Sequence, residues 1–89
     1  MTGYATIFWN YRIIKKESEG IGIGTYGIHE VFYNEDGKPV AYTKDPVAVE
    51  WDEDDDWLEG EHILNRMLEA FNDPVLTHDD FPNNDGGLK

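Results

Sequence analysis

The stretch YGIHEVFYNEDGKPVAYT, residues 26–43, decides the fold. Its first part, Tyr26–Tyr33, alternates β-branched and aromatic side chains between two faces, which is the period of a β-strand. Asn34–Lys38 predicts a hairpin turn, because Asp36 tolerates a positive φ and Gly37 adopts one at no steric cost. Pro39–Thr43 resumes as the next strand, so the stretch predicts an antiparallel hairpin.

A further strand is predicted upstream of this hairpin. Between Thr6 and Ile14 the chain again alternates with period two, and both faces of that strand carry apolar residues. Three glycines and two charged residues between Glu17 and Gly24 predict a loop or a bulged start of the next strand.

Downstream of the hairpin the apolar period changes to three and four residues, which predicts a helix from about Asp55 to Phe71. We expect Leu64, Met67, Leu68 and Phe71 to pack against the sheet. Asn72-Asp73-Pro74 ends the helix. Val75 and Leu76 then could pack back onto the sheet edge.

These elements predict an α+β fold, a small antiparallel three-stranded sheet followed by one helix packed on one face, in the order β-β-β-α. We expect residues 1–81 to form a single domain and residues 82–89 to form a flexible tail. The other face of the sheet stays uncovered and carries some of Phe8, Trp9 and Tyr11. Such an open apolar face predicts a possible homodimer.

The charge of the chain is strongly asymmetric. Nineteen acidic and seven basic residues among 89 give a net charge of −12, and the segment from Asp45 onward holds fourteen acids against two bases. The absence of cysteine excludes a disulfide framework and thiolate chemistry. No apolar stretch is long enough for a membrane span or a signal peptide, so we expect a soluble, cytoplasmic protein.

The motifs for ligand chemistry lack their structural context. Gly22–Gly27 matches G-x-G-x-x-G, but a strand is predicted after it where a phosphate site needs a helix, so we interpret it as a β-connection. Asp52–Asp56 has the first carboxylates of a calcium loop but Trp57 where glycine is required, which leaves only weak divalent binding open. The three histidines have no shared ligand spacing, and we expect His29 to lie on a strand face and His62 on the helix flank.

No catalytic constellation is specified by spacing, so we expect no enzymatic activity and no cofactor. The candidate site is instead an acid-rich segment with two tryptophans in it. It consists of Glu50, Trp51, Asp52, Glu53, Asp54, Asp55, Asp56, Glu59 and Glu61. One interpretation is a solubilising surface, and the other is a surface that imitates the phosphates of a nucleic acid. In the second, we expect Trp51 to contact the partner and Trp57 to belong to the core.

Several strings carry a resemblance to a family of small uncharacterised bacterial and phage proteins: Trp9–Ile14, Tyr26–Pro39, Thr43, Pro46-Val47, Met67–Ala70 and Pro74–Leu76. The resemblance covers roughly Trp9 to Leu76 and implies no known activity. In size and charge the chain is also similar to phage inhibitors of restriction and CRISPR systems. In architecture it resembles HicB-type antitoxins, although their aspartate–leucine–proline–glycine segment is absent.

We therefore expect a non-enzymatic phage or mobile-element inhibitor that occupies the basic nucleic-acid-binding surface of a host protein. It would bind neither nucleic acid nor membrane directly and would act in the cytoplasm of a bacterial host. The alternative is an antitoxin-like module that neutralises a small basic toxin. The sequence leaves both partners open.

Overall fold

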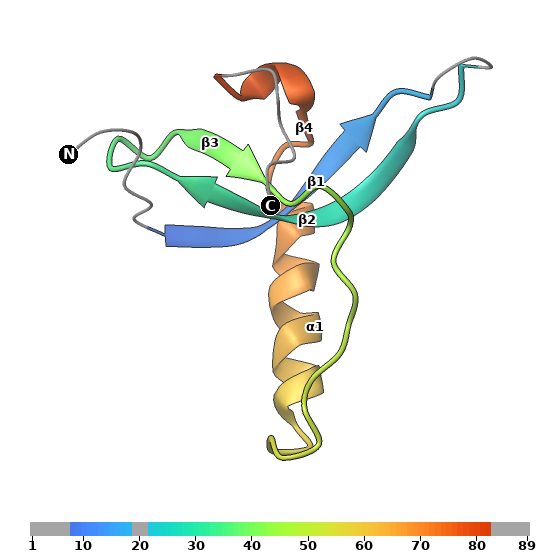
Figure 1. Ribbon diagram of the computed structural model, residues 1–89, viewed down its shortest axis with the longest axis vertical. Helices are drawn as coiled ribbons and strands as arrows, with labels where there is room; N and C mark the ends of the chain where they lie inside the picture. Colours follow the sequence, from blue (N-terminus) through green and yellow to red (C-terminus); the bar gives the residue numbers. More distant parts are fainter. Residues whose placement is uncertain (1–7, 19–21, 83–89) are drawn as a thin grey trace.

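The computed structural model describes residues 8–18 and 22–82 and shows an α+β fold. The strands are β1 (Phe8–Lys16), β2 (Thr25–Tyr33), β3 (Pro39–Tyr42) and β4 (Leu76–Thr77); the helix α1 spans Glu59–Glu69, and short 3₁₀ turns follow at η1 (Ala70–Asn72) and η2 (His78–Asp80) (Figure 1). None of the helices among these residues is both long and apolar enough to cross a bilayer. The predicted tail from residue 83 onward lies outside the described residues.

The sheet has four strands in the order β3-β2-β1-β4. β1 pairs antiparallel with β2 along its whole length, from Phe8 opposite Tyr33 to Lys16 opposite Thr25, and β2 pairs antiparallel with β3. β4 adds to the free side of β1 in parallel, with Leu76 opposite Ile14. The three predicted strands are present, but the sheet is mixed. A two-residue strand is too short to leave a period in the sequence.

The hairpin turn is confirmed. Asn34 N–H donates to Lys38 O at 3.0 Å, and Asn34 Oδ1 accepts from the N–H groups of Asp36 and Lys38 at 2.9 and 3.0 Å. Gly37 has a φ of 78°, the left-handed conformation that glycine adopts without a Cβ clash. The glycine motif also belongs to strand structure, because β2 begins at Thr25, inside the motif.

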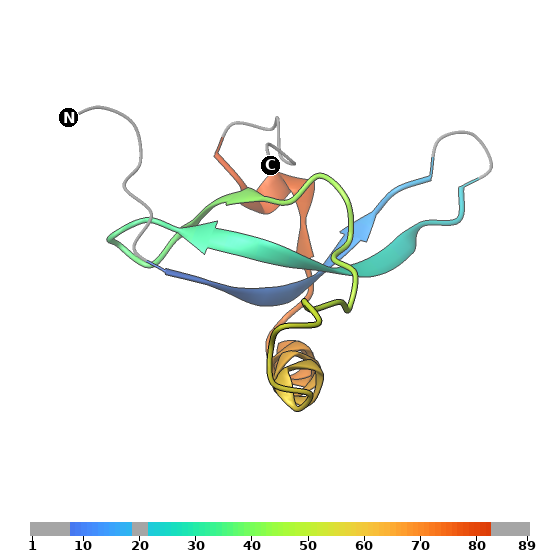
Figure 2. The same ribbon diagram turned by 60° about the horizontal axis from the view of Figure 1, so that its bottom comes forward.

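Two apolar cores lie on opposite faces of the sheet. On the helix side, Tyr11 and Ile13 of β1 pack with Ile63, Met67 and Ala70. Figure 2 shows α1 on one side of the sheet and the η2 segment on the other. That second side holds the core formed by Ile14, Val31, Tyr33, Tyr42 and Phe81.

The prediction of an uncovered sheet face is therefore wrong for the described part of the chain. Phe81 is only 3% exposed and covers the face away from the helix, where its ring lies 4.6 Å from that of Tyr42. Tyr11 is buried on the helix side. Phe8 stacks on Tyr33 at 4.5 Å but stays 45% exposed, and Trp9 is 39% exposed, so both keep part of the predicted exposure.

Arg12 ties the segment after the helix to β1. Its Nη1 donates to Tyr33 Oη at 2.9 Å and its Nη2 donates to Pro74 O at 2.8 Å. Asp73 Oδ2 lies 3.8 Å from Arg12 Nε. This charged anchor fixes the point where the chain leaves the helix and turns toward β4.

The helix is shorter than predicted and buries a different face. Its buried residues are Gly60, Ile63 and Met67, followed by Ala70. Met67 is in the core as expected. The other three residues predicted for the core are exposed: Leu64 at 53%, Leu68 at 65% and Phe71 at 64%. The buried line is displaced by about 100° around the helix, the angle between consecutive residues.

Candidate partner-binding surface

The acid-rich segment lies at the end of the molecule farthest from the sheet. The chain leaves β3, runs beside α1, and turns back into the helix, whose first residues point away from the sheet (Figure 1). We call the eight carboxylates of this region the acidic tip: Glu50, Asp52, Glu53, Asp54, Asp55, Asp56, Glu59 and Glu61. Seven of the eight residues are exposed, and Glu59 is half-buried.

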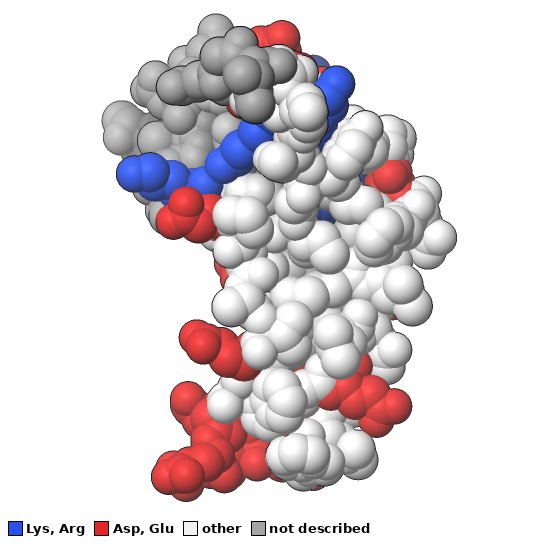
Figure 3. All heavy atoms as spheres, turned by 90° about the vertical axis from the view of Figure 1, so that its right-hand side faces the viewer, with Lys and Arg blue, Asp and Glu red and all other residues white. Residues whose placement is uncertain are grey.

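The acidic tip has no basic residue within it. Between Asp45 and Asn65 the chain contains no lysine or arginine. On the face shown in Figure 3 the acidic side chains gather at the lower end, and basic side chains lie toward the upper end. The charge asymmetry of the sequence is therefore an asymmetry in space, with a negative end that can attract cationic groups over a Debye length.

Two of the carboxylates also fix the path of the backbone. Asp56 Oδ1 accepts from Leu58 N–H at 2.8 Å, and Asp55 Oδ2 accepts from Asp52 N–H at 3.3 Å. Backbone bonds from Asp55 N–H to Asp52 O and from Glu59 N–H to Asp56 O close two successive turns. These turns occupy the residues that were predicted to begin the helix, which is why it starts only at Glu59. Acids in its first turn suit the positive end of the helix dipole.

The prediction that Trp57 belongs to the core is wrong, whereas the partner contact predicted for Trp51 stays a prediction. Trp57 is 80% exposed, whereas Trp51 is partly buried and packs against the helix-side core. A Cβ on Gly60 would lie 2.2–2.6 Å from three atoms of the Trp51 ring, so the helix accepts this ring only because it has glycine there. The two indoles meet edge to face with centroids 6.0 Å apart. Loop residues lack the helical register that the prediction assumed for Trp57.

A hollow of about 450 Å³ lies between the tryptophans and the acids. It is lined by Glu50, Trp51, Asp52, Glu53, Asp55 and Trp57. Aromatic faces and carboxylates together favour a guanidinium or an ammonium group, through cation–π attraction and charge-assisted hydrogen bonds. Chemically, the hollow suits a lysine or arginine side chain of a partner.

Within residues 8–18 and 22–82, no three His, Asp or Glu side chains are grouped so that they could hold a metal ion. The carboxylates of Asp52–Asp56 are thus spread along two turns rather than directed at one point. Whether the segment binds divalent cations weakly stays a prediction.

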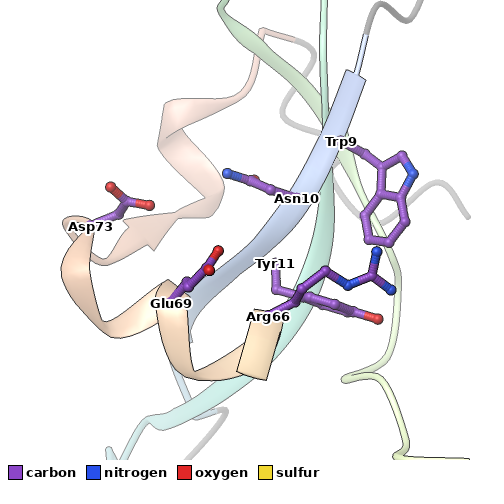
Figure 4. Close-up of a pocket in the computed structure, with 6 residues that line it drawn as sticks. All are labelled: Trp9, Asn10, Tyr11, Arg66, Glu69 and Asp73. Atoms are coloured by element: carbon purple, nitrogen blue, oxygen red, sulfur yellow. The ribbon is translucent and has the colours of Figure 1, made fainter. Parts of the chain in front are cut away.

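A second hollow, of about 230 Å³, lies between the start of β1 and the end of α1 (Figure 4). Its lining residues are Trp9, Asn10, Tyr11, Arg66, Glu69 and Asp73. The Arg66 guanidinium lies 5.6 Å from the Trp9 ring and 5.8 Å from the Tyr11 ring, and Figure 4 shows it between helix and strand. Sequence reasoning missed this site, because residues so distant in sequence meet only through the fold. Arg66 is occupied by the two rings, so we interpret it as a link between α1 and β1.

His29 lies in strand β2, as predicted, and its side chain is buried there. It is 1% exposed, its Nδ1 donates to Thr43 O at 2.8 Å, and its ring contacts that of Tyr42 edge to face. Burial lowers the pKa of His29 from its ordinary value of 6.5; Thr43 O and Asp45 oppose this effect, and Lys16 adds to it. His29 is therefore a neutral structural group near neutral pH.

This burial predicts a stability that falls as the solution is acidified. Below pH 6.5 the unfolded chain protonates His29 before the folded chain does, so the free energy of unfolding decreases from about 6.5 down to the lowered pKa. Urea unfolding at a series of pH values measures the slope. His29→Asn retains a donor near the Nδ1 position but does not titrate, and it should flatten the slope in this window. An equal slope in both proteins would assign the pH dependence to other groups.

Comparison of the chain with protein-family models, with curated proteins and with solved structures gave no match.

Proposed function

We propose that the protein is a non-enzymatic inhibitor that binds a basic nucleic-acid-binding protein through its acidic tip. The observation that carries the proposal is the exposure of this tip at one end of the molecule, with no lysine or arginine between Asp45 and Asn65. An inhibitor of this kind, encoded by a phage or a mobile element, would act in the cytoplasm of its bacterial host.

The physical basis is the replacement of phosphates by carboxylates. Duplex DNA carries one negative charge for each ~1.7 Å of its axis, and proteins bind it by neutralising several phosphates with lysine and arginine. The acidic tip offers eight carboxylates within twelve residues, held on two turns and the first turn of the helix. A basic groove that binds DNA would therefore meet a density of negative charge at the acidic tip comparable to that of the duplex.

The tryptophans supply apolar contact area, which the carboxylates of the acidic tip do not. Trp57 is the most exposed large apolar side chain among the described residues, and aromatic side chains dominate the binding energy of protein interfaces. With Trp51 it borders the hollow of about 450 Å³, whose lining of indoles and carboxylates suits a cationic side chain. We thus propose that the carboxylates raise the rate of association with the partner and that the indoles lower the rate of its dissociation.

The test compares three immobilised proteins as baits in a bacterial lysate. One bait has the native sequence, one is the double variant Glu53→Lys/Asp54→Lys, and the matched control is Glu35→Lys/Asp79→Lys. Both variants change the net charge by the same amount at exposed positions, and the first leaves the turn-forming Asp55 and Asp56 intact. We expect the native and control baits to retain a nucleic-acid-binding protein that the tip variant loses.

Two further measurements decide the mechanism. Duplex DNA should elute the captured protein, because both ligands occupy one surface. The tip variant should slow association by about tenfold at low salt with a smaller change in dissociation, since steering between charges is a rate effect that salt screens. Equal capture by all three baits would leave the acids as a solubilising surface. A captured small basic toxin, not displaced by DNA, would favour the antitoxin-like alternative.

A further inference from the structure

The two indoles at the acidic tip form a corner that the fold holds in place. Trp51 rests on the helix at Gly60 and packs against the helix-side core, so its ring is fixed before any ligand arrives. Trp57 meets this ring edge to face, with ring planes at 69° and centroids 6.0 Å apart. Trp57 is 80% exposed, which leaves most of an indole in water in the isolated chain. Aromatic walls beside a few polar groups are the usual lining of a ligand site.

The carboxylates that border this corner are available to a ligand. Glu50, Asp52 and Glu53 line the hollow of about 450 Å³, and within residues 8–18 and 22–82 their side chains make no hydrogen bond or ion pair. The backbone that carries them is held by the turn in which Asp55 N–H donates to Asp52 O at 3.0 Å. Because a desolvated carboxylate without a donor is costly, a ligand of this hollow must offer hydrogen-bond donors as well as a surface that stacks on an indole.

We propose that the hollow binds the guanidinium group of an arginine side chain in preference to the ammonium group of a lysine. This inference rests on the proposed function and names the residue type of the partner that the acidic tip recognises. A guanidinium is planar and weakly hydrated and carries five N–H donors in a fixed fork. It can therefore stack on an indole face and donate to the carboxylates of Glu50, Asp52 or Glu53 at the same time. Proteins use the same fork to bind phosphate groups, so the phosphate-binding surface of a partner supplies such a residue.

Other cations use only part of this lining. A lysine ammonium is a compact and strongly hydrated charge, which loses more hydration when it moves against an indole face. A quaternary ammonium suits the aromatic faces but has no N–H group, so it would leave the carboxylates without a donor. A divalent metal ion needs converging ligands, and the part of the chain that the structure describes has no such group. The combination of two indoles with unpaired carboxylates thus favours a guanidinium.

The experiment titrates the native chain with three small probes: N-acetyl-arginine amide, N-acetyl-lysine amide and tetramethylammonium. All titrations are made at one ionic strength, because salt screens the acids. The indole N–H signals of the three tryptophans are followed by NMR and assigned with single Trp→Phe variants. Trp9 is the internal reference, since its ring lies 5.6 Å from the Arg66 guanidinium in the other hollow. We expect the arginine probe to shift Trp51 and Trp57 but not Trp9, and to bind roughly fivefold or more tightly than the lysine probe.

Three variants separate the contributions of the indole and the carboxylates. Trp57→Ala removes the exposed wall of the corner and should weaken the arginine probe by roughly fivefold or more, with loss of the preference over lysine. Glu53→Gln removes the charge of a lining side chain and should weaken it by roughly threefold or more. Glu35→Gln, the matched control, removes the same charge at the hairpin turn and should change binding by less than about twofold. Because all three positions are exposed, circular dichroism should show folded variants.

Four results would overturn the proposal: equal affinity for the arginine and lysine probes, tighter binding of tetramethylammonium, shifts of Trp9 as large as those at the tip, or no shift up to ~50 mM probe. The lysate experiment is independent of these titrations. A nucleic-acid-binding protein that is captured and displaced by DNA, with no preference of the hollow for arginine, would contradict this inference and leave the proposed function standing. Selective arginine binding without capture of such a protein would support the site and contradict the proposed function.

Discussion

Replacing Phe81 with alanine should cost about 3–5 kcal/mol of stability, most of what a domain of this size has. Phe81 is 3% exposed, lies against Tyr42 and closes the core on the face away from the helix. Removing its ring leaves a cavity beside Ile14 and Val31, both fully buried. Urea unfolding followed by tryptophan fluorescence measures the loss.

Phe71→Ala is the matched control, because it removes the same side chain from a position that is 64% exposed. It should change stability by no more than about 0.5 kcal/mol. Phe81→Leu, with an expected cost of about 1–2 kcal/mol, stays measurable if the alanine variant does not fold. If Phe71→Ala lowered the free energy of unfolding as much as Phe81→Ala, Phe71 would belong to the core, as the sequence predicts.

Gly60→Ala should destabilise the native protein and stabilise a Trp51→Ala variant. Alanine gains ~1 kcal/mol over glycine inside a helix. In the native protein its Cβ would meet the Trp51 ring at 2.2–2.6 Å, so the ring must move out of its place on the core. Overpacking costs about 1–3 kcal/mol, and the displaced ring loses contacts in addition, so the net effect is a loss of about 1–2 kcal/mol.

Without the indole, only the gain in helix propensity remains, and the sign of the Gly60→Ala effect inverts. The double-mutant cycle should therefore give a coupling energy of about 2–3 kcal/mol between positions 51 and 60. Four urea titrations measure it. A stabilising Gly60→Ala in the native background would mean that Trp51 does not rest on the helix. Leu64→Ala, an exposed helix position, controls for general effects on the helix.

The strands and the hairpin could be predicted because their signals are local. Period two and the Asn34–Lys38 turn chemistry act over a few residues, and the structure contains both. The helix was predicted for the same reason. Its orientation was not, because the exposed residues Leu64 and Leu68 directly follow the buried residues Ile63 and Met67, so both lines belong to one broad apolar arc. Hydrophobic periodicity identifies such an arc but does not indicate which part of it packs against the sheet.

The remaining errors involve contacts between distant residues. Nothing local indicates that Phe81 crosses to the face of Ile14, or that Trp51 reaches Gly60 from a loop. The burial of His29 also has no local signal, since it depends on Tyr42 of the next strand and on Thr43 directly after that strand. The residues of the acidic tip, by contrast, could be identified from the sequence as one exposed segment, because consecutive carboxylates stay in water. Their function stays a proposal.

The pairing of β4 with β1 has a consequence for the synthesis of the protein. The chain is made from its N-terminus. The pairing of β1 with β4 can therefore form only after nearly all of the described residues have left the ribosome. Until then Ile14 and Tyr42 lack the cover that Phe81 provides. A chain cut short after Thr77 would keep its hairpin but expose this apolar face, which proteases and chaperones recognise. Exposure of this apolar face would thereby mark a chain that lacks the segment carrying Phe81.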